Sequence, residues 1–230
     1  MSTTENIKLP VSKSLLIYGV LWVGFIAYAA ILAPPDNPET LDVILKLSSG
    51  QISELNPFLV AVFNLMGVWP MIYGCMLLAD GHERSPKAWP FLAGSFGVGA
   101  FAVLPYLAFR KSLGGEATQD FSEGRLWTLK FWDSRWLPLV LFAGAGALAV
   151  YGITQGDWTD FVNQWQSSKF VHVMSLDFCA LSVLFPTLVG DDVTRRRGDN
   201  PSLWTAIACI PLFGPLTYLL LRPSLFQKTN

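Results

Sequence analysis

Two ionisable residues, His172 and Asp177, lie inside a long apolar run of the sequence that extends from Phe170 to Gly190. A charge at membrane depth costs on the order of a few kcal/mol, so such groups usually face protein and find partners. The chemistry open to them is a proton or ion relay, and the structural alternative is an interhelical hydrogen bond that fixes packing. The imidazole of His172 could also bind a pigment, through the magnesium of chlorophyll or by contact with a carotenoid. A spacing of five residues puts the two side chains on different helix faces, so they predict no metal site.

The same run carries a stripe of mostly small or polar residues at helical spacing, which suits close packing against another helix. Its members are His172, Ser175, Cys179, Ser182 and Pro186. Asp177 points about 200° away from Ser175 and Cys179. Because neither face suits full exposure to lipid, we expect this run to be central in a helix bundle.

A second run, Phe58 to Ala79, offers a small or polar face made of Asn64, Gly67, Met71 and Gly74. Pro70 lies in the middle of this run, where the amide that it lacks would free a carbonyl for another partner. In the last apolar run, Pro211 and Pro215 predict a kink, either for packing, which we favour, or for a cavity. The candidate functional residues are therefore Asp177, Asn64 and His172.

Composition places these runs in a membrane. Of the 230 residues, 52% are hydrophobic and 14% are charged, against roughly a quarter charged in soluble domains. The net charge of -1 gives no basic field for nucleic acid. The three cysteines, Cys75, Cys179 and Cys209, have neither zinc-site nor redox spacing. With no catalytic motif, we expect a protein that is not an enzyme.

Six apolar runs, uncharged except for His172 and Asp177 in the fifth, are long enough for a bilayer core of about 30 Å. They predict an all-α integral membrane fold with six transmembrane helices. The runs are Leu15–Ala33, Phe58–Ala79, Ala88–Phe109, Trp136–Ile153, Phe170–Gly190 and Leu203–Leu221. The connector after the first run contains a segment, Glu39 to Leu47, that could form a surface helix or a plain loop. The charged connector of residues 191–199 is interpreted as solvated and charge-balanced.

An internal repeat emerges when the second half of the chain is shifted over the first by 112 positions. The matching pairs include Phe58 with Phe170, Asp80 with Asp192, Phe101 with Phe213, Tyr106 with Tyr218 and Arg110 with Arg222. Three spans per unit would make the second copy enter from the opposite side, as an inverted repeat. The predicted divisions are a tail (1–14), a first repeat (15–111), a connector (112–135), a second repeat (136–222) and a final tail (223–230).

Six crossings distribute the basic residues almost evenly between the two sides of the membrane. Seven Lys and Arg residues fall on the side of the N-terminus and nine on the other. The positive-inside bias therefore nearly cancels, as an antisymmetric chain would make it do. Orientation stays open, with a slight preference for the basic third and fifth connectors facing the cytoplasm or stroma.

Several stretches resemble an uncharacterised membrane family of cyanobacteria and plastids. They are Asn56-Pro57-Phe58 through Val68-Trp69-Pro70, Gly156-Asp157-Trp158, and VHVMSLDFCALSVLFPTLVGDD from Val171. The last three runs are also similar to a small bacterial three-helix membrane domain of unknown function, through Asp177, Arg195 to Arg197, Trp204, Pro215 and Arg222. The resemblance implies a thylakoid membrane or the plasma membrane of a photosynthetic bacterium, and no known reaction.

Two functions follow as expectations. The first is a non-catalytic accessory or assembly protein that contacts membrane lipid and subunits of a photosynthetic complex, with Asp177 as an internal polar lock. The second is a small transporter or channel, motivated by the inverted repeat and the buried carboxylate.

Overall fold

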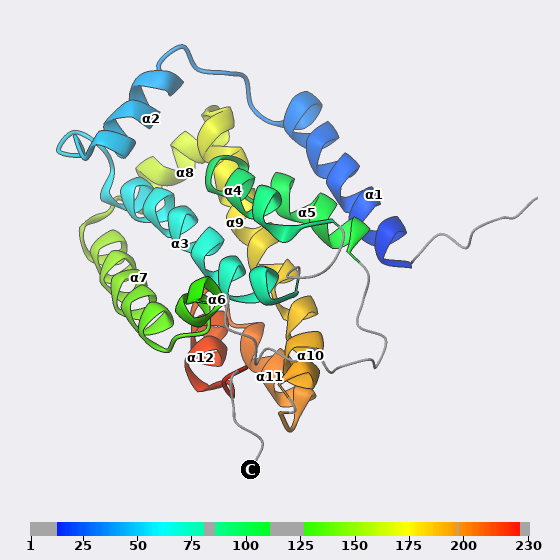
Figure 1. Cartoon of the computed structure of the whole chain (residues 1–230). Helices are drawn as coiled ribbons and strands as arrows, with labels where there is room; N and C mark the ends of the chain where they lie inside the picture. Colours follow the sequence, from blue (N-terminus) through cyan, green and yellow to red (C-terminus); the bar gives the residue numbers. More distant parts are fainter. Residues whose placement is uncertain (1–12, 81–85, 111–126, 197, 226–230) are drawn as a thin grey trace, which may run out of the picture.

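The computed structural model describes residues 13–80, 86–110, 127–196 and 198–225, and all regular secondary structure in these ranges is helical (Figure 1). The first half contains α1 (Lys13–Ala27) with a π-helical turn (Tyr28–Leu32), α2 (Thr40–Ser49), α3 (Pro57–Asp80), α4 (Ala88–Val98) and α5 (Ala100–Phe109). The second half contains α6 (Trp127–Trp132), α7 (Trp136–Gln155), α8 (Trp158–Ser167), α9 (Lys169–Leu184), α10 (Pro186–Arg195), α11 (Pro201–Ala208) and α12 (Phe213–Leu221). The predicted all-α class is confirmed.

Four helical segments are long and apolar enough to span a membrane, judged by length and composition. They are Lys13–Leu32, Pro57–Leu78, Trp136–Gln155 and Lys169–Arg195. The apolar stretches of α3 and of α9–α10 are 56% and 44% buried inside the protein, against 17% for α7 and 0% for the first segment. The central position expected for the fifth run is therefore confirmed, and α3 shares it.

The predicted third span consists of two short helices that fold back on each other. α4 and α5 meet at Gly99, and the ring centroids of Phe91 and Tyr106 lie 5.7 Å apart. In one continuous helix these two residues would stand about 22 Å apart. Each arm is about 15 Å long, which is half of the bilayer core. The α4–α5 pair is thus a half-length hairpin.

The predicted sixth span has the same form. The rings of Trp204 in α11 and Tyr218 in α12 lie 5.6 Å apart, where a continuous helix would separate them by about 21 Å. The chain reverses just before α12, at Leu212, which has a φ of +62°. A side chain on Gly214 would overlap the carbonyl oxygen of Ile207, so the two arms approach closely only because residue 214 is glycine.

The central helices α3 and α9 run in the same direction. Their aromatic contacts follow one another in the same order along both helices: Phe63 with Phe170, Trp69 with Phe178, and Tyr73 with Phe185. An inverted repeat would set these two helices antiparallel. Neither the inverted repeat nor six full crossings is confirmed.

α7 runs antiparallel to α3 and packs closely along it. A side chain on Gly152, near the end of α7, would press on Ala61 near the start of α3. Just before α7, the ring of Trp132 covers Gly74 near the end of α3. Glycine at position 74 is therefore required by close approach, as its place in the packing face predicted.

The two ends of the bundle carry different elements. At the end that we call the His172 end, Tyr28 after α1 contacts His172 near the start of α9. Phe161 of α8 packs there beside Leu59 and Val43, which belong to α3 and α2. Of the two alternatives for residues 39–47, a surface helix or a plain loop, the structure has the helix, α2. We call the opposite end, where both hairpins have their bases, the Arg222 end.

The order of elements repeats along the chain, with a long helix, a short helix, a second long helix and a hairpin in each half. The shift of 112 positions places α5 on α12 and sets Gly99 opposite Pro211, so both chain reversals fall at matching positions. The predicted tail 1–14, the connector 112–135 and the tail 223–230 lie largely outside the described residues.

Candidate functional site

Asp177 lies in α9 beside the tip of the α4–α5 hairpin, and it is only 5% exposed. Its Oδ1 accepts a hydrogen bond of 2.7 Å from the backbone N–H of Ala100, the first residue of α5. The first N–H groups of a helix have no partner within the helix and carry partial positive charge. The carboxylate of Asp177 therefore caps a helix that begins inside the protein.

Gly99 is the residue that makes this contact possible. Its backbone has φ +50° and ψ −123°, a conformation that residues with a side chain rarely adopt. A Cβ at this position would also overlap Oδ2 of Asp177. The chain reversal and the close approach of the carboxylate therefore both depend on glycine.

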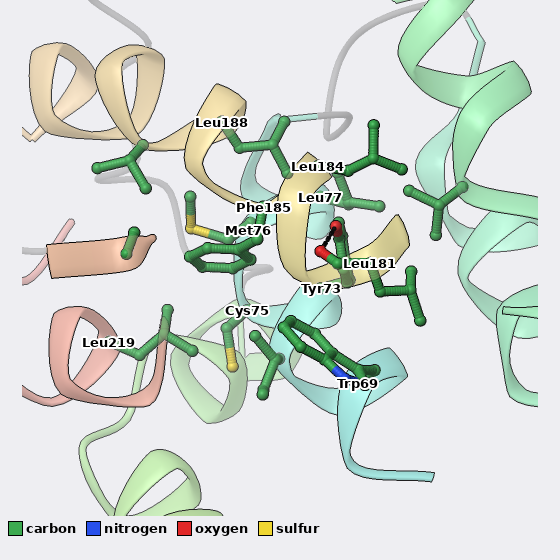
Figure 2. Close-up of a cluster of buried hydrophobic side chains, with 14 of the residues drawn as sticks. Trp69, Tyr73, Cys75, Met76, Leu77, Leu181, Leu184, Phe185, Leu188 and Leu219 are labelled. Atoms are coloured by element: carbon green, nitrogen blue, oxygen red, sulfur yellow. Dashed lines mark hydrogen bonds between the residues drawn. The ribbon is translucent and has the colours of Figure 1, made fainter. Parts of the chain in front are cut away.

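Asp177 has no ion pair among the described residues, and the backbone N–H of Ala100 is its one hydrogen-bond partner there. Leu181, one turn after Asp177 in α9, belongs to the apolar and aromatic cluster that also contains Trp69 and Phe185 (Figure 2). The nearby hydroxyl of Tyr73 donates to the carbonyl oxygen of Leu181 at 2.8 Å. Among the described residues, Asp177 is thus a buried carboxylate without a cation to offset its charge.

Asn64 does not join this site. Its side chain is exposed on α3, and its Nδ2 donates to the carbonyl oxygen of Val60, one turn earlier in the same helix, at 2.8 Å. The sequence placed Asn64 one position from the repeat equivalent of Asp177, and that equivalent, Leu65, is buried. The side chain of Asn64 therefore points outward, whereas that of the next residue, Leu65, lies on the packed face of α3.

His172 is held by four contacts at the His172 end. Its ring stacks on Trp165, with centroids 4.3 Å apart, and on Tyr28 at 5.8 Å. Nδ1 lies 2.9 Å from the carbonyl oxygen of Trp165, and Nε2 lies 2.8 Å from the hydroxyl of Tyr28. A carbonyl only accepts, so Nδ1 donates and Nε2 accepts from Tyr28. Both ring nitrogens are engaged, and a pigment magnesium would have to displace Tyr28.

The other predicted packing residues occupy varied places. Ser175 is half-buried and donates its hydroxyl to Val171 in its own helix, whereas Cys179 is exposed. Pro70 is buried within an unbroken α3. Pro211 lies in the reversal before α12, and Pro215 lies in the first turn of α12, where a missing N–H leaves no gap in the helix. The predicted kink at these prolines is thus a complete reversal.

A buried ionic cluster at the Arg222 end corrects the interpretation of residues 191–199 as a solvated connector. Asp192 is 1% exposed, Arg222 4% and Arg196 6%. Oδ2 of Asp192 lies 2.7 Å from Nε of Arg196 and 3.1 Å from Nη1 of Arg222, and it accepts from the hydroxyl of Tyr218 at 2.7 Å. Arg195 reaches Oδ1 of Asp192 at 3.1 Å.

The same cluster ties together segments that are distant in sequence. Nη1 of Arg196 also binds Oδ1 of Asp133, the residue after α6. The other oxygen of Asp133 accepts from the Ser224 hydroxyl and the Leu225 N–H, and Arg222 donates to the carbonyl oxygen of Cys75 in α3. Burial lowers the pKa of Arg196, but the attraction of Asp192 and Asp133 outweighs burial and raises that pKa above its ordinary value. These charges stay ionised and fix the base of the second hairpin.

The repeat carried a signal for this cluster that sequence reasoning did not use. Asp192 and Arg222 each match an identical residue in the first half of the chain, Asp80 and Arg110. A pair of opposite charges that recurs together is a candidate ion pair. Asp133, by contrast, has no such mark in the sequence.

The fold and the site together define a class. In its described residues the protein is all-helical, with apolar helices compatible with a multi-pass membrane protein, two half-length hairpins and a buried carboxylate that has no ion pair there. No group of three or more potential metal ligands occurs in the described part of the chain. Comparisons with known protein families, curated proteins and solved structures find no match to it.

Proposed function

We propose that the chain crosses the membrane four times and that its two hairpins enter from the Arg222 end and return to it. Non-helical backbone at membrane depth is tolerated only where protein or a water-filled cavity surrounds it. Ala100 and Leu212, at the two hairpin tips, are 0% and 2% exposed, which meets that condition. The exposed apolar faces of α1 and α7 are then covered by lipid.

Basic residues support one orientation of this four-span arrangement. Two described cations, Lys46 and Lys169, lie at the His172 end. Eight lie at the Arg222 end: Lys13, Lys87, Arg110, Lys130, Arg135, Arg195, Arg196 and Arg222. Cytoplasmic connectors carry an excess of Lys and Arg. The Arg222 end accordingly faces the cytoplasm or stroma. The near-equal division of Lys and Arg residues between the two sides, which six spans would give, does not hold for four.

The function that the geometry supports best is that of a small transporter or channel that binds its conducted or coupled ion at Asp177. The observation that carries this proposal is the single backbone hydrogen bond on a carboxylate that is 5% exposed. A buried carboxylate without a cationic partner is costly, so it takes up a proton or a cation. Half-helices that begin at membrane depth beside such a group are a recurring feature of transporter binding sites.

A flux assay tests this function directly. Purified protein in proteoliposomes is expected to carry a proton or alkali-cation flux that falls to background in Asp177→Asn. Asn64→Ala is the matched control, because it alters another intramembrane polar residue whose side chain bonds only within its own turn. Wild-type flux in folded Asp177→Asn protein would sink the proposal.

A second candidate is a non-catalytic accessory or assembly protein of a thylakoid membrane. It is favoured by the exposed Asn64 and Gly67 on one face of α3, since polar and small residues at membrane depth suit contact with another transmembrane helix. Gentle purification discriminates the two functions. Photosystem subunits or chlorophyll in stoichiometric amounts, with no flux, would favour the accessory role.

A further inference from the structure

We infer that the ion exchanged at Asp177 is a proton and that alkali cations do not bind there. This inference rests on the function proposed above and names its substrate. It follows from what surrounds the two oxygens of the carboxylate: one faces an N–H donor at the start of α5, and the other faces the backbone of Gly99.

A metal cation at this site would need several oxygen ligands besides the carboxylate of Asp177. Hard cations such as Ca²⁺ and Mg²⁺ take six or more oxygen ligands. Other hard cations also prefer carbonyl and carboxylate oxygens as ligands. The carbonyl oxygen of Gly99 already accepts from Ala102 and Val103 at 3.1 and 3.3 Å. The Ser95 carbonyl accepts from Gly99 at 2.9 Å. The carbonyl oxygens of Gly99 and Ser95 are therefore already engaged within the hairpin.

The electrostatic field at the hairpin tip also opposes a metal cation. The N-terminus of a helix carries the equivalent of roughly half a positive charge. Asp177 sits against that terminus through Ala100, so a cation placed on Oδ1 would meet both the donor N–H and the positive end of α5. The same field opposes a proton, but a proton needs no further ligands, because it forms a covalent bond to Oδ2 and leaves Oδ1 to accept from Ala100.

The chemical step is a balanced protonation. The carboxylate of Asp177 takes a proton from a hydronium ion on one side of the membrane: an O–H bond of hydronium breaks and leaves water, and an O–H bond forms on Oδ2. That bond breaks again when the proton passes to another water molecule. The other titratable groups packed on this side are phenols: Tyr73 of α3 lies within electrostatic reach of both Asp177 and Tyr18 of α1. Neither phenol contributes to a carboxyl infrared band.

Infrared difference spectroscopy of the full chain in liposomes tests the inference. We titrate wild type and Asp177→Asn in sodium, potassium and choline buffers and follow the protonated carboxyl band. The expected result is a band that is lost in Asp177→Asn and titrates with the same midpoint in all three buffers. Asp177→Glu keeps a carboxyl at the site and should retain a band at a shifted frequency, which separates loss of the group from loss of the fold.

Two results would overturn the inference. One is a midpoint that sodium or potassium displaces relative to choline, because a competing cation then binds the carboxylate. The other is a carboxyl spectrum that is the same in wild type and in Asp177→Asn. If the band is the same in all three buffers but no flux is found, proton binding at Asp177 is supported and transport is refuted. If the flux depends on sodium and the band shifts with sodium, transport is supported and proton-only binding is refuted.

Discussion

Two buried aspartates, Asp177 and Asp192, each hold one of the two hairpins, and they do so by opposite means. Asp192 lies at the base of the α11–α12 hairpin and binds the guanidinium groups of Arg195, Arg196 and Arg222. Asp177 lies at the tip of the α4–α5 hairpin and binds one backbone N–H. The carboxylate of Asp192 is surrounded by cations, whereas that of Asp177 has none near it among the described residues.

This difference separates a structural role from a functional one. A carboxylate locked among guanidinium groups stays ionised, and its hydrogen bonds fix the helices that supply them. A buried carboxylate without a cationic partner changes its protonation state more readily, because burial disfavours its charged form. The α11–α12 hairpin is therefore anchored, whereas the tip of the α4–α5 hairpin can respond to an exchanged ion.

The largest effect is expected from breaking the paired aspartate. Asp192→Asn leaves three guanidinium groups around one remaining carboxylate, Asp133, and should destabilise the protein by about 3–5 kcal/mol. Thermal unfolding in detergent measures this loss. Asp177→Asn should cost about 1 kcal/mol or less, because its amide oxygen still accepts from Ala100.

The neighbouring residue provides the control for that prediction. Asp191 pairs with Arg110 at 3.1 Å, and its side chain is 27% exposed. Because Asp191 is more exposed than Asp192, whose side chain is 1% exposed, Asp191→Asn should lose less stability than Asp192→Asn. Equal losses in Asp191→Asn and Asp192→Asn would mean that the cluster does not anchor the hairpin.

A smaller effect is expected at the tip of the first hairpin. Gly99→Ala places a Cβ against the carboxylate of Asp177 in a left-handed backbone conformation, which should cost about 1–3 kcal/mol. Gly97→Ala, two residues earlier in α4 with open space around it, should be neutral or slightly stabilising. Denaturant unfolding compares the two variants, and the penalty of Gly99→Ala should shrink in an Asp177→Ala background. An unchanged penalty would mean that the cost of Gly99→Ala does not come from contact with the Asp177 carboxylate.

The smallest loss of stability is expected from removing a hydrogen bond between two neutral side chains, for comparison with the losses at the two carboxylates. Tyr28→Phe removes the hydroxyl that donates to Nε2 of His172 and should cost about 1 kcal/mol, measured by thermal unfolding. The control is Tyr151→Phe, whose hydroxyl has no partner among the described residues. A loss as large as that of Asp192→Asn would show that the His172 end carries more of the stability than the ionic cluster does.

The sequence predicted the helical class and the central place of the fifth run, because these follow from composition and from the cost of burying polar groups. It did not separate a crossing from a hairpin, since a run such as Ala88–Phe109 has the same length and hydropathy in either form. One residue, Gly99, reverses the chain, and glycines are frequent in spanning helices too. The odd number of apolar runs per repeat then led to the predicted inversion.

The site was predictable in part for the same reason. Asp177 was identified because it interrupts an apolar run, but its partner Ala100 lies 77 positions away and donates through its backbone, which leaves no mark in the sequence. The ionic cluster was missed because charges that alternate in sign, such as Asp192 and Arg196, have the composition of a solvated connector. Their burial depends on Asp133 and Arg222, which come from distant segments.

The most direct test is the sidedness of the α4–α5 hairpin. Lys87→Cys and Lys130→Cys flank it, and Ser48→Cys lies in α2 at the His172 end. We would measure labelling by a membrane-impermeant maleimide in sealed vesicles, corrected for the wild-type background. Lys87→Cys and Lys130→Cys should react from the same side, and Ser48→Cys from the other. Reaction of Lys87→Cys and Lys130→Cys from opposite sides would make α4–α5 a crossing and contradict the hairpin that places Asp177 at its tip.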